Sequence, residues 1–310
     1  RFKLLIEMRK TALLVCLFVV FSTINISGSN AILIKNETSN GIIYVDDDGG
    51  ADFTSIQDAI NASSAGDTIF VSSGTYYENI VIDKSITLQG EDKEATIIDG
   101  TGSGESEDII RVNVNEIQIY DFTIQNGGHN GSCIGLVHSN NSIISNCVLL
   151  NSHYGIGTFE SNNITINSCD ISNHVNYGIY LHNTSNSLIN SCFVHNNSLY
   201  GIAIGYHSNY NTISSCNIYE NTYGGIGIGD SSKNIIKNCT IHNSIYTYYS
   251  HTAILLDNSS NNTIESCLIH DVRGDGISFF NSSSNTIRSC KLYNFGNNGI
   301  DFQFSCNNLI

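Results

Sequence analysis

A cysteine that recurs about every 23 residues constrains the fold of this chain more than any other feature. Each of seven such cysteines has Ile three residues before it and Leu, Ile or Val two residues after it. A second apolar block, mostly Gly-Ile, follows within each repeat. A fixed period of this length is typical of a solenoid, in which each repeat buries its apolar side against its neighbours. The seven are Cys147, Cys169, Cys192, Cys216, Cys239, Cys267 and Cys290.

The residues within each repeat predict strands, because apolar and polar residues alternate in each block. Asn, Ser and Gly separate the blocks and are typical of turns. Coils stacked about 4.8 Å apart would pair every strand with its equivalents above and below. We therefore predict an all-β, right-handed, single-stranded parallel β-helix. A leucine-rich repeat has a similar period, but it needs a helical segment and a Leu-dominated pattern, and Leu is sparse here.

The β-helix domain is expected over residues 42–310, with a cap over 42–66 and coils over 67–310. Phe53, Ile56, Ala59 and Ile60 fall on one face of a short helical segment. Such a helix would shield the open strand edges of the first coil. Strands are expected to follow at 68–71, 80–82, 86–88 and 96–98.

The same region carries a family resemblance. The matching runs are Asp52-Phe-Thr-Ser-Ile-Gln-Asp-Ala-Ile-Asn61, Gly66-Asp-Thr-Ile-Phe-Val71, Gly74-Thr-Tyr76, Glu78-Asn-Ile80, Ile86-Thr-Leu-Gln-Gly90 and Thr96-Ile-Ile-Asp-Gly100. They resemble the first coils of pectin-lyase-like right-handed parallel β-helix proteins, above all NosD-like and archaeal cell-surface members. The resemblance implies the fold and leaves the activity open, because that fold carries lyases, hydrolases, epimerases, adhesins and metal-handling proteins.

Charge and the N-terminus indicate an exported protein. Acidic residues outnumber Lys and Arg by 28 to 13, for a net charge of −15, which disfavours a nucleic-acid partner. Met8, Arg9-Lys10, the apolar run 12–21 and the small residues 29–31 are typical of a secretory signal. Residues 1–31 are therefore expected to be upstream residues plus a signal peptide, with an uncleaved membrane anchor as the alternative. We expect an extracellular or cell-surface protein with no membrane contact except through that signal or a C-terminal anchor.

Two further expectations concern modification and length. Asn-x-Ser/Thr sequons such as Asn183, Asn258 and Asn281 are dense, so the chain is either a glycoprotein or simply rich in Asn and Ser. The last residues, 305–310, match the start of another repeat. We expect further repeats or a cap to follow, because a bare end would expose strand edges.

The cysteine column has three interpretations. Stacked coils place Cα atoms within the disulfide range, but parallel Cβ vectors leave the Cβ atoms about 4.8 Å apart. Free cysteines pack well in cores as small apolar residues. We therefore favour a structural packing role over a disulfide ladder or a set of soft-metal ligands.

A second column, three residues after the cysteines, consists of His and Tyr and is expected to point outward. Its rings suit sugar stacking, and cross-strand packing is the alternative. His242, His270 and Asp271 could together hold a transition metal. The members of the column are His195, Tyr219, His242, His270 and Tyr293.

Carboxylates are the candidate catalytic groups. Asp257, Asp271, Asp275 and Asp301 gather in the last coils, and glycosidic cleavage uses a carboxylate pair. The family resemblance implies acidic Ca²⁺ sites in lyases of this fold. Residues 46–48 with Asp52 could bind Ca²⁺ near the cap, or form a charged turn.

Three functions follow from these patterns. The first is a surface β-helix that binds polysaccharide or another cell-surface glycan, or acts as an adhesin-like component. The second is a polysaccharide lyase or glycoside hydrolase that uses the four aspartates. The third is a NosD-like protein that handles a metal such as copper through the His column.

Overall fold

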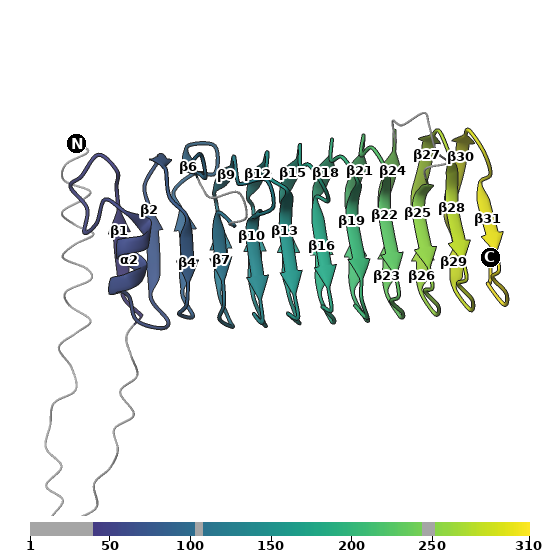
Figure 1. Ribbon diagram of the computed structural model, residues 1–310, viewed down its shortest axis with the longest axis horizontal. Helices are drawn as coiled ribbons and strands as arrows, with labels where there is room; N and C mark the ends of the chain where they lie inside the picture. The colour runs from purple at the N-terminus through teal and green to yellow at the C-terminus, as the bar shows by residue number, and fades with distance from the viewer. Residues whose placement is uncertain (1–39, 103–107, 244–251) are drawn as a thin grey trace, which may run out of the picture. The chain divides into compact units, whose positions relative to one another are not determined.

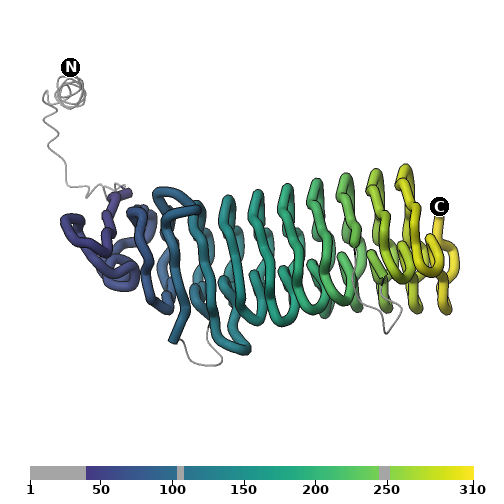
Figure 2. Tube along the Cα trace, turned by 90° about the horizontal axis from the view of Figure 1, so that it is seen from above, coloured from purple at the N-terminus to yellow at the C-terminus, as the bar shows by residue number. Residues whose placement is uncertain are grey.

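The computed structural model describes residues 40–102, 108–243 and 252–310. The predicted signal segment at 1–31 lies outside these residues. The described chain forms a right-handed parallel β-solenoid, as predicted. Its coils follow one another along a single axis, from purple to yellow in Figures 1 and 2. Each full coil contributes one short strand to each of three sheets, which we call A, B and C.

Sheet A has 11 strands in the described residues, and all its neighbouring strands pair in parallel. Its strands are β1 (Ile42–Val45), β2 (Thr68–Val71), β5 (Thr87–Gly90), β8 (Gln118–Tyr120), β11 (Ile143–Ser145), β14 (Thr165–Asn167), β17 (Leu188–Asn190), β20 (Thr212–Ser214), β23 (Ile235–Lys237), β26 (Thr263–Glu265) and β29 (Thr286–Arg288).

From β11 onward, sheet B follows sheet A in each coil after one corner residue and a cysteine. Its strands in the described chain are β3 (Gly74–Tyr76), β6 (Thr96–Asp99), β9 (Thr123–Gln125), β12 (Val148–Leu150), β15 (Asp170–Ser172), β18 (Phe193–His195), β21 (Asn217–Tyr219), β24 (Thr240–His242), β27 (Leu268–Val272) and β30 (Lys291–Phe295).

Sheet C contains the longest strands, up to six residues, and carries the Gly-Ile blocks. Within the described ranges its strands are β4 (Ile80–Ile82), β7 (Ile110–Val112), β10 (Ser132–Val137), β13 (Tyr154–Phe159), β16 (Ile179–His182), β19 (Tyr200–Gly205), β22 (Gly224–Gly229), β25 (Thr252–Asp257), β28 (Asp275–Phe280) and β31 (Ile300–Gln303).

The predicted capping helix is α2 (Ile56–Ala62). Its Ile56, Ala59 and Ile60 are fully buried. Glu78, from the following coil, accepts hydrogen bonds from the backbone N–H groups of Ile56 and Gln57, at 2.8 and 2.9 Å. A carboxylate there satisfies helix donors that have no partner within the helix. Phe53 was expected in this helix, but it lies before it in a β-bridge with Val45.

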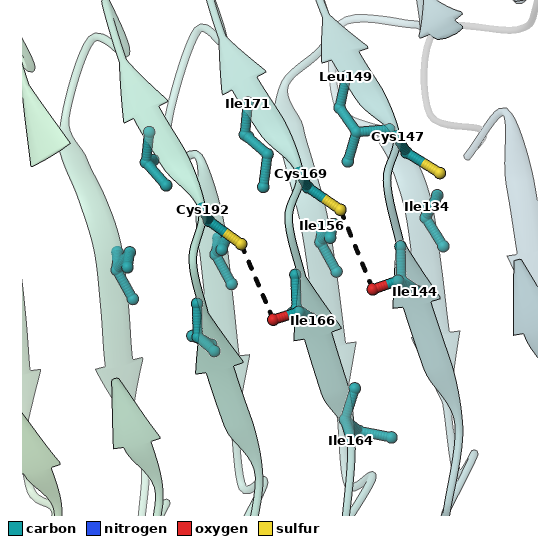
Figure 3. Packing of buried hydrophobic residues seen from close by; sticks show 14 of the residues in the cluster. Ile134, Ile144, Cys147, Leu149, Ile156, Ile164, Ile166, Cys169, Ile171 and Cys192 are labelled. Atoms are coloured by element: carbon teal, nitrogen blue, oxygen red, sulfur yellow. Dashed lines mark hydrogen bonds between the residues drawn. The ribbon is translucent and has the colours of Figure 1, made fainter. Parts of the chain in front are cut away.

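The cysteine column fills the inner corner between sheets A and B (Figure 3). The residue before each cysteine has a left-handed backbone, with φ between 50° and 56°, which turns the chain sharply within one residue. Each cysteine donates its thiol to the carbonyl two residues earlier, at 3.3–3.4 Å. Cys192 also contacts the carbonyl of Ile166 in the coil before, at 3.8 Å. All the described cysteines are free thiols.

Polar ladders hold the corner between sheets C and A. The N–H of Ser231 donates to Ser259 Oγ of the next coil at 3.1 Å, and the N–H of Asn234 donates to Asn262 Oδ1 at 2.8 Å. The same bonds recur from coil to coil, and these side chains are almost fully buried. Buried backbone donors that leave a sheet need such partners. The corner polar residues are therefore structural. The side chains on the outward faces of the sheets remain available for function.

Candidate functional site

The His and Tyr column lies on the outer face of sheet B and forms one continuous stack. Neighbouring ring centroids lie 4.7–5.3 Å apart, and neighbouring ring planes differ by 8° or less. Parallel strand register places each ring directly beside its equivalent in the next coil. We call this stack the sheet B ladder; it comprises His195, Tyr219, His242, His270 and Tyr293.

The stacking disfavours the metal site predicted at His242, His270 and Asp271. The planes of the two imidazoles are parallel, with centroids 5.1 Å apart, so their in-plane nitrogen lone pairs cannot converge on one ion. One nitrogen of each ring also has a protein partner: His242 Nε2 lies 3.2 Å from Asn217 Oδ1, and His270 Nδ1 lies 2.6 Å from Asp271 Oδ2. No group of three or more metal-binding side chains is found among the described residues.

Electrostatics in the ladder follow from the same contacts. Burial, and then the neighbouring His270, lower the pKa of His242. Hydrogen bonds from His270 and Asn294 lower the pKa of the exposed Asp271. The rings of the ladder cover each other's faces, and its edges and ends reach solvent.

The four predicted catalytic aspartates lie in the last coils, as expected, but on two different sheets. Asp271 lies on sheet B, beside His270. The other three lie on sheet C, where Asp301 pairs in register with Ser278. Only Asp257 and Asp275 line the same hollow.

The acidic turn near the cap has its own partners. Its carboxylates accept hydrogen bonds from backbone N–H groups, which satisfies them without an ion. The pairs are Asp46 with Asp48, Asp47 with Thr75, and Asp52 with Tyr44, at 3.0–3.2 Å.

Glycines and tyrosines alternate on the outer face of sheet C, and this makes the surface uneven. In β22 the three outward positions are Gly224, Gly227 and Gly229, whereas the coil before it places Tyr200 beside them. A Cβ atom at Gly224 would lie only 2.7 Å from Tyr200 Cε1. The Tyr200 ring therefore packs directly against the backbone of β22, and any residue larger than glycine at position 224 would prevent this contact.

Two adjoining hollows result, and together we call them the sheet C groove. The first has a volume of about 200 Å³ and crosses β16, β19, β22 and β25. The second has a volume of about 330 Å³ and extends to β28 and β31. Tyr200, Leu255 and Asp257 line both hollows, so the groove runs across the strands and along the solenoid axis.

An aromatic cluster forms one wall of the groove. Its lining members are Tyr177, Tyr180 and Tyr206, and the ring centroids of Tyr177 and Tyr180 lie 5.2 Å apart. His182 does not line the groove, but its ring centroid lies 4.4 Å from that of Tyr206. The hydroxyl of Tyr180 lies 3.0 Å from His182 Nδ1. Burial raises the pKa of Tyr180 to about 12 and also raises the pKa of Tyr200. The phenols therefore stay protonated at neutral pH and can donate hydrogen bonds.

Asp257 stands between the two hollows and has an unused acceptor. Its Oδ1 is buried and has no hydrogen-bond partner in the described chain. Burial, and then the nearby Asp230, raise the pKa of Asp257. A buried polar atom without a partner is uncommon in folded proteins. An incoming hydroxyl group would satisfy it.

Asp257 is among the residues that the sequence pattern predicts to be catalytic, but the tyrosines of this groove were not predicted. A signal was present: Tyr stands directly before Gly-Ile at Tyr154, Tyr177 and Tyr200. It gains meaning only with the strand register, which places Tyr154 and Tyr177 with their ring centroids 5.9 Å apart.

Fold and groove together define a right-handed parallel β-helix protein with a surface groove. The chain belongs to the right-handed β-helix family. The family model, described as "Right handed beta helix region", matches residues 108–246 and 200–310.

A curated relative comes from the archaeon Methanothermus fervidus and is named a cell surface glycoprotein. It is 33% identical over 142 residues. That match covers 44% of this chain and 21% of the relative, so the chain spans about a fifth of the relative's length.

Solved structures share the fold at low identity. The A-module of the Azotobacter vinelandii mannuronan C-5 epimerase AlgE4 superposes with a TM-score of 0.68 at 13% identity, over 82% of this chain and 78% of that one. The periplasmic alginate epimerase AlgG gives 0.53 at 14% identity, over 88% and 84% of the two chains. Pectate lyase Pel9A gives 0.51 at 13% identity, over 83% and 78%. At this identity the likeness concerns the fold alone.

Proposed function

We propose that this chain is a cell-surface β-helix that binds a polysaccharide along the sheet C groove. The name of the Methanothermus relative supports the location. The names of the structural neighbours include mannuronan, alginate and pectate, which supports a carbohydrate partner. Within the described ranges, no helix is long and apolar enough to cross a bilayer.

The unused Oδ1 of Asp257, between two hollows lined by tyrosines, is the observation that carries the proposal. Sugar rings present apolar faces and hydroxyl edges, which match aromatic rings and hydrogen-bonding groups, respectively. The groove crosses successive coils, which stack about 4.8 Å apart. An extended sugar chain lying along the axis would therefore meet equivalent positions at each coil.

A matched pair of tyrosines tests this proposal. Tyr206 and Tyr210 lie four residues apart, are 59% and 54% exposed, and have φ of 54° and 60°. Only Tyr206 lines the groove, while the Tyr210 hydroxyl bonds Lys233 Nζ at 2.6 Å. Titrations against a panel of cell-wall polysaccharides should show at least about fivefold weaker binding for Tyr206→Ala and little change for Tyr210→Ala. Equal effects of the two variants, or no binding to any polymer, would reject the groove as the binding site.

Catalysis on the bound chain is the second candidate, because Asp257 and Asp275 line one hollow. A raised pKa at Asp257 suits a proton donor. Incubation with each bound polymer, followed by measurement of new reducing ends and unsaturated products, distinguishes an enzyme from a binding protein. Product that disappears in both Asp257→Asn and Asp275→Asn would establish catalysis, and intact polymer would leave binding as the function.

A further inference from the structure

The groove contains carboxylates and no positive charge. Asp257 and Asp275 line the second hollow, and Asp257 also lines the first. Of the described residues that line either hollow, none is Lys, Arg or His. A carboxylate-bearing sugar would therefore meet like charges without a compensating cation.

Basic side chains elsewhere on the described surface have other neighbours. Lys233 bonds Tyr210, and Lys291 Nζ lies 5.0 Å from the Tyr293 ring centre, on sheet B. Arg288 pairs with Glu265 on sheet A. Arg273 is exposed two residues before Asp275, but it does not line the groove.

The burial of Asp257 strengthens the repulsion between the groove and a sugar carboxylate. A charge interacts more strongly at a partly buried site than in open water. The Oδ1 atom of Asp257 is buried and unpartnered, and Asp230 already adds negative potential beside it. The net charge of −15 acts in the same direction at longer range. A sugar hydroxyl can donate to the Asp257 carboxylate, which lines both hollows, whereas a sugar carboxylate has no proton to donate and is repelled.

We propose that the sheet C groove selects uncharged glycans, whose hydroxyl groups donate to Asp257, and excludes uronic-acid polymers. This inference rests on the proposed function, and it narrows the ligand to one chemical class. It is carried by the lining of the groove. Aromatic rings form one wall, Asp257 lies between the hollows, Asp275 lines the second hollow, and no basic residue is among the described lining.

Polymer pairs that differ only in their carboxylates test the inference. Native polygalacturonate and alginate would each be compared with their carboxyl-reduced forms, alongside neutral cell-wall glycans, by affinity electrophoresis and calorimetry. We expect the neutral form to bind at least about tenfold more tightly at low salt. Raising the salt to about 1 M, where the Debye length falls to about 3 Å, should narrow the difference.

Substitutions that remove carboxylates test whether the preference for neutral polymers depends on the charge of the groove or on its shape. Asp257→Asn with Asp275→Asn should reduce the preference to less than about threefold, since both carboxylates become neutral amides of similar size. Asp301→Asn is the matched control, because Asp301 lies on sheet C but does not line the groove. Arg273→Gln should leave the preference unchanged.

The outcomes distinguish the two proposals. Equal or tighter binding of the acidic polymers, with Tyr206→Ala still weakening it, would overturn the neutral-glycan inference and keep the groove. Loss of the preference in Asp301→Asn would also overturn it, because the charge that matters would then lie outside the groove. Absence of binding by every polymer would reject the proposed function itself.

Discussion

Sheets B and C carry similar aromatic side chains on their outer faces, but those of sheet B stack continuously, whereas those of sheet C border a groove. In the sheet B ladder, five successive coils place His or Tyr at one register position, so each ring stacks on the next. In sheet C, the equivalent positions pass from Tyr to Ala and Gly within three coils, as at Tyr180, Ala203 and Gly227. In a uniform column, each ring face is covered by the next ring. In an interrupted column, some ring faces stay uncovered and space remains for a ligand.

Filling the gap in sheet C should have the largest effect. A Cβ atom at Gly229 would meet nothing within 4 Å, so a side chain there can extend into the first hollow without strain. Gly229→Phe should weaken glycan binding at least about tenfold while the fold is kept. Calorimetry and circular dichroism measure the two quantities. Gly229→Ser, which leaves most of the hollow open, is the graded control; equal binding by all three proteins would contradict the assignment.

Interrupting the sheet B ladder should affect stability and leave binding intact. Tyr219 stacks on His195 at 4.7 Å and on His242 at 5.3 Å. Each aromatic pair contributes about 0.5–1.5 kcal/mol beyond its buried area, so Tyr219→Ala should lower the free energy of unfolding by about 1–3 kcal/mol. Urea denaturation measures the change.

Phe193 provides the control for that experiment, because it is 51% exposed on the same sheet and outside the ladder. Its replacement by Ala should change the free energy of unfolding by about 0.5 kcal/mol or less. A larger loss for Phe193→Ala than for Tyr219→Ala would show that ring stacking does not stabilise sheet B. Weakened glycan binding by Tyr219→Ala would contradict the assignment of stability to sheet B and of binding to sheet C.

Lowering the pH should reduce the stability of the fold by a smaller amount. The folded-state pKa of His242 is lowered by burial and by His270, whereas its unfolded value is about 6.5. As pH falls through about 6.5, the unfolded chain takes up this proton more readily, so the contribution of His242 to stability is lost. Thermal unfolding between about pH 8 and pH 5 should show this decline. His242→Phe keeps a ring in the stack and should make the curve less steep; an unchanged slope would exclude His242 as its source.

Much of the fold could be predicted because every repeat has the same pattern of buried apolar residues. Strands β2 and β4 have the predicted bounds, and β6 differs by one residue at its end. Strand β5 begins one residue later and ends two residues later than expected. Phe53 matched the helical spacing but lies outside α2, because its bridge to Val45 continues sheet A toward the cap.

The candidate site was less predictable, because it depends on neighbours that are about 23 residues apart. His242, His270 and Asp271 are close in space, but the parallel planes that disfavour a shared metal follow only from the strand register. Asp275 and Asp301 looked equivalent in sequence, yet only Asp275 lines a hollow. The orphaned oxygen of Asp257 depends on burial by surrounding coils.

By itself, the amino-acid sequence determined the solenoid and the inward cysteine column, because burying one apolar side per repeat allows few other arrangements. It left two or three strands per coil open, and the structure has three sheets. The tertiary structure alone decided which outward residues meet. Stacking in register aligned the rings of sheet B with one another, and it placed the glycines of β22 between Tyr200 and Asp257. A groove arises there because the missing side chains of one coil lie beside the large side chains of the next.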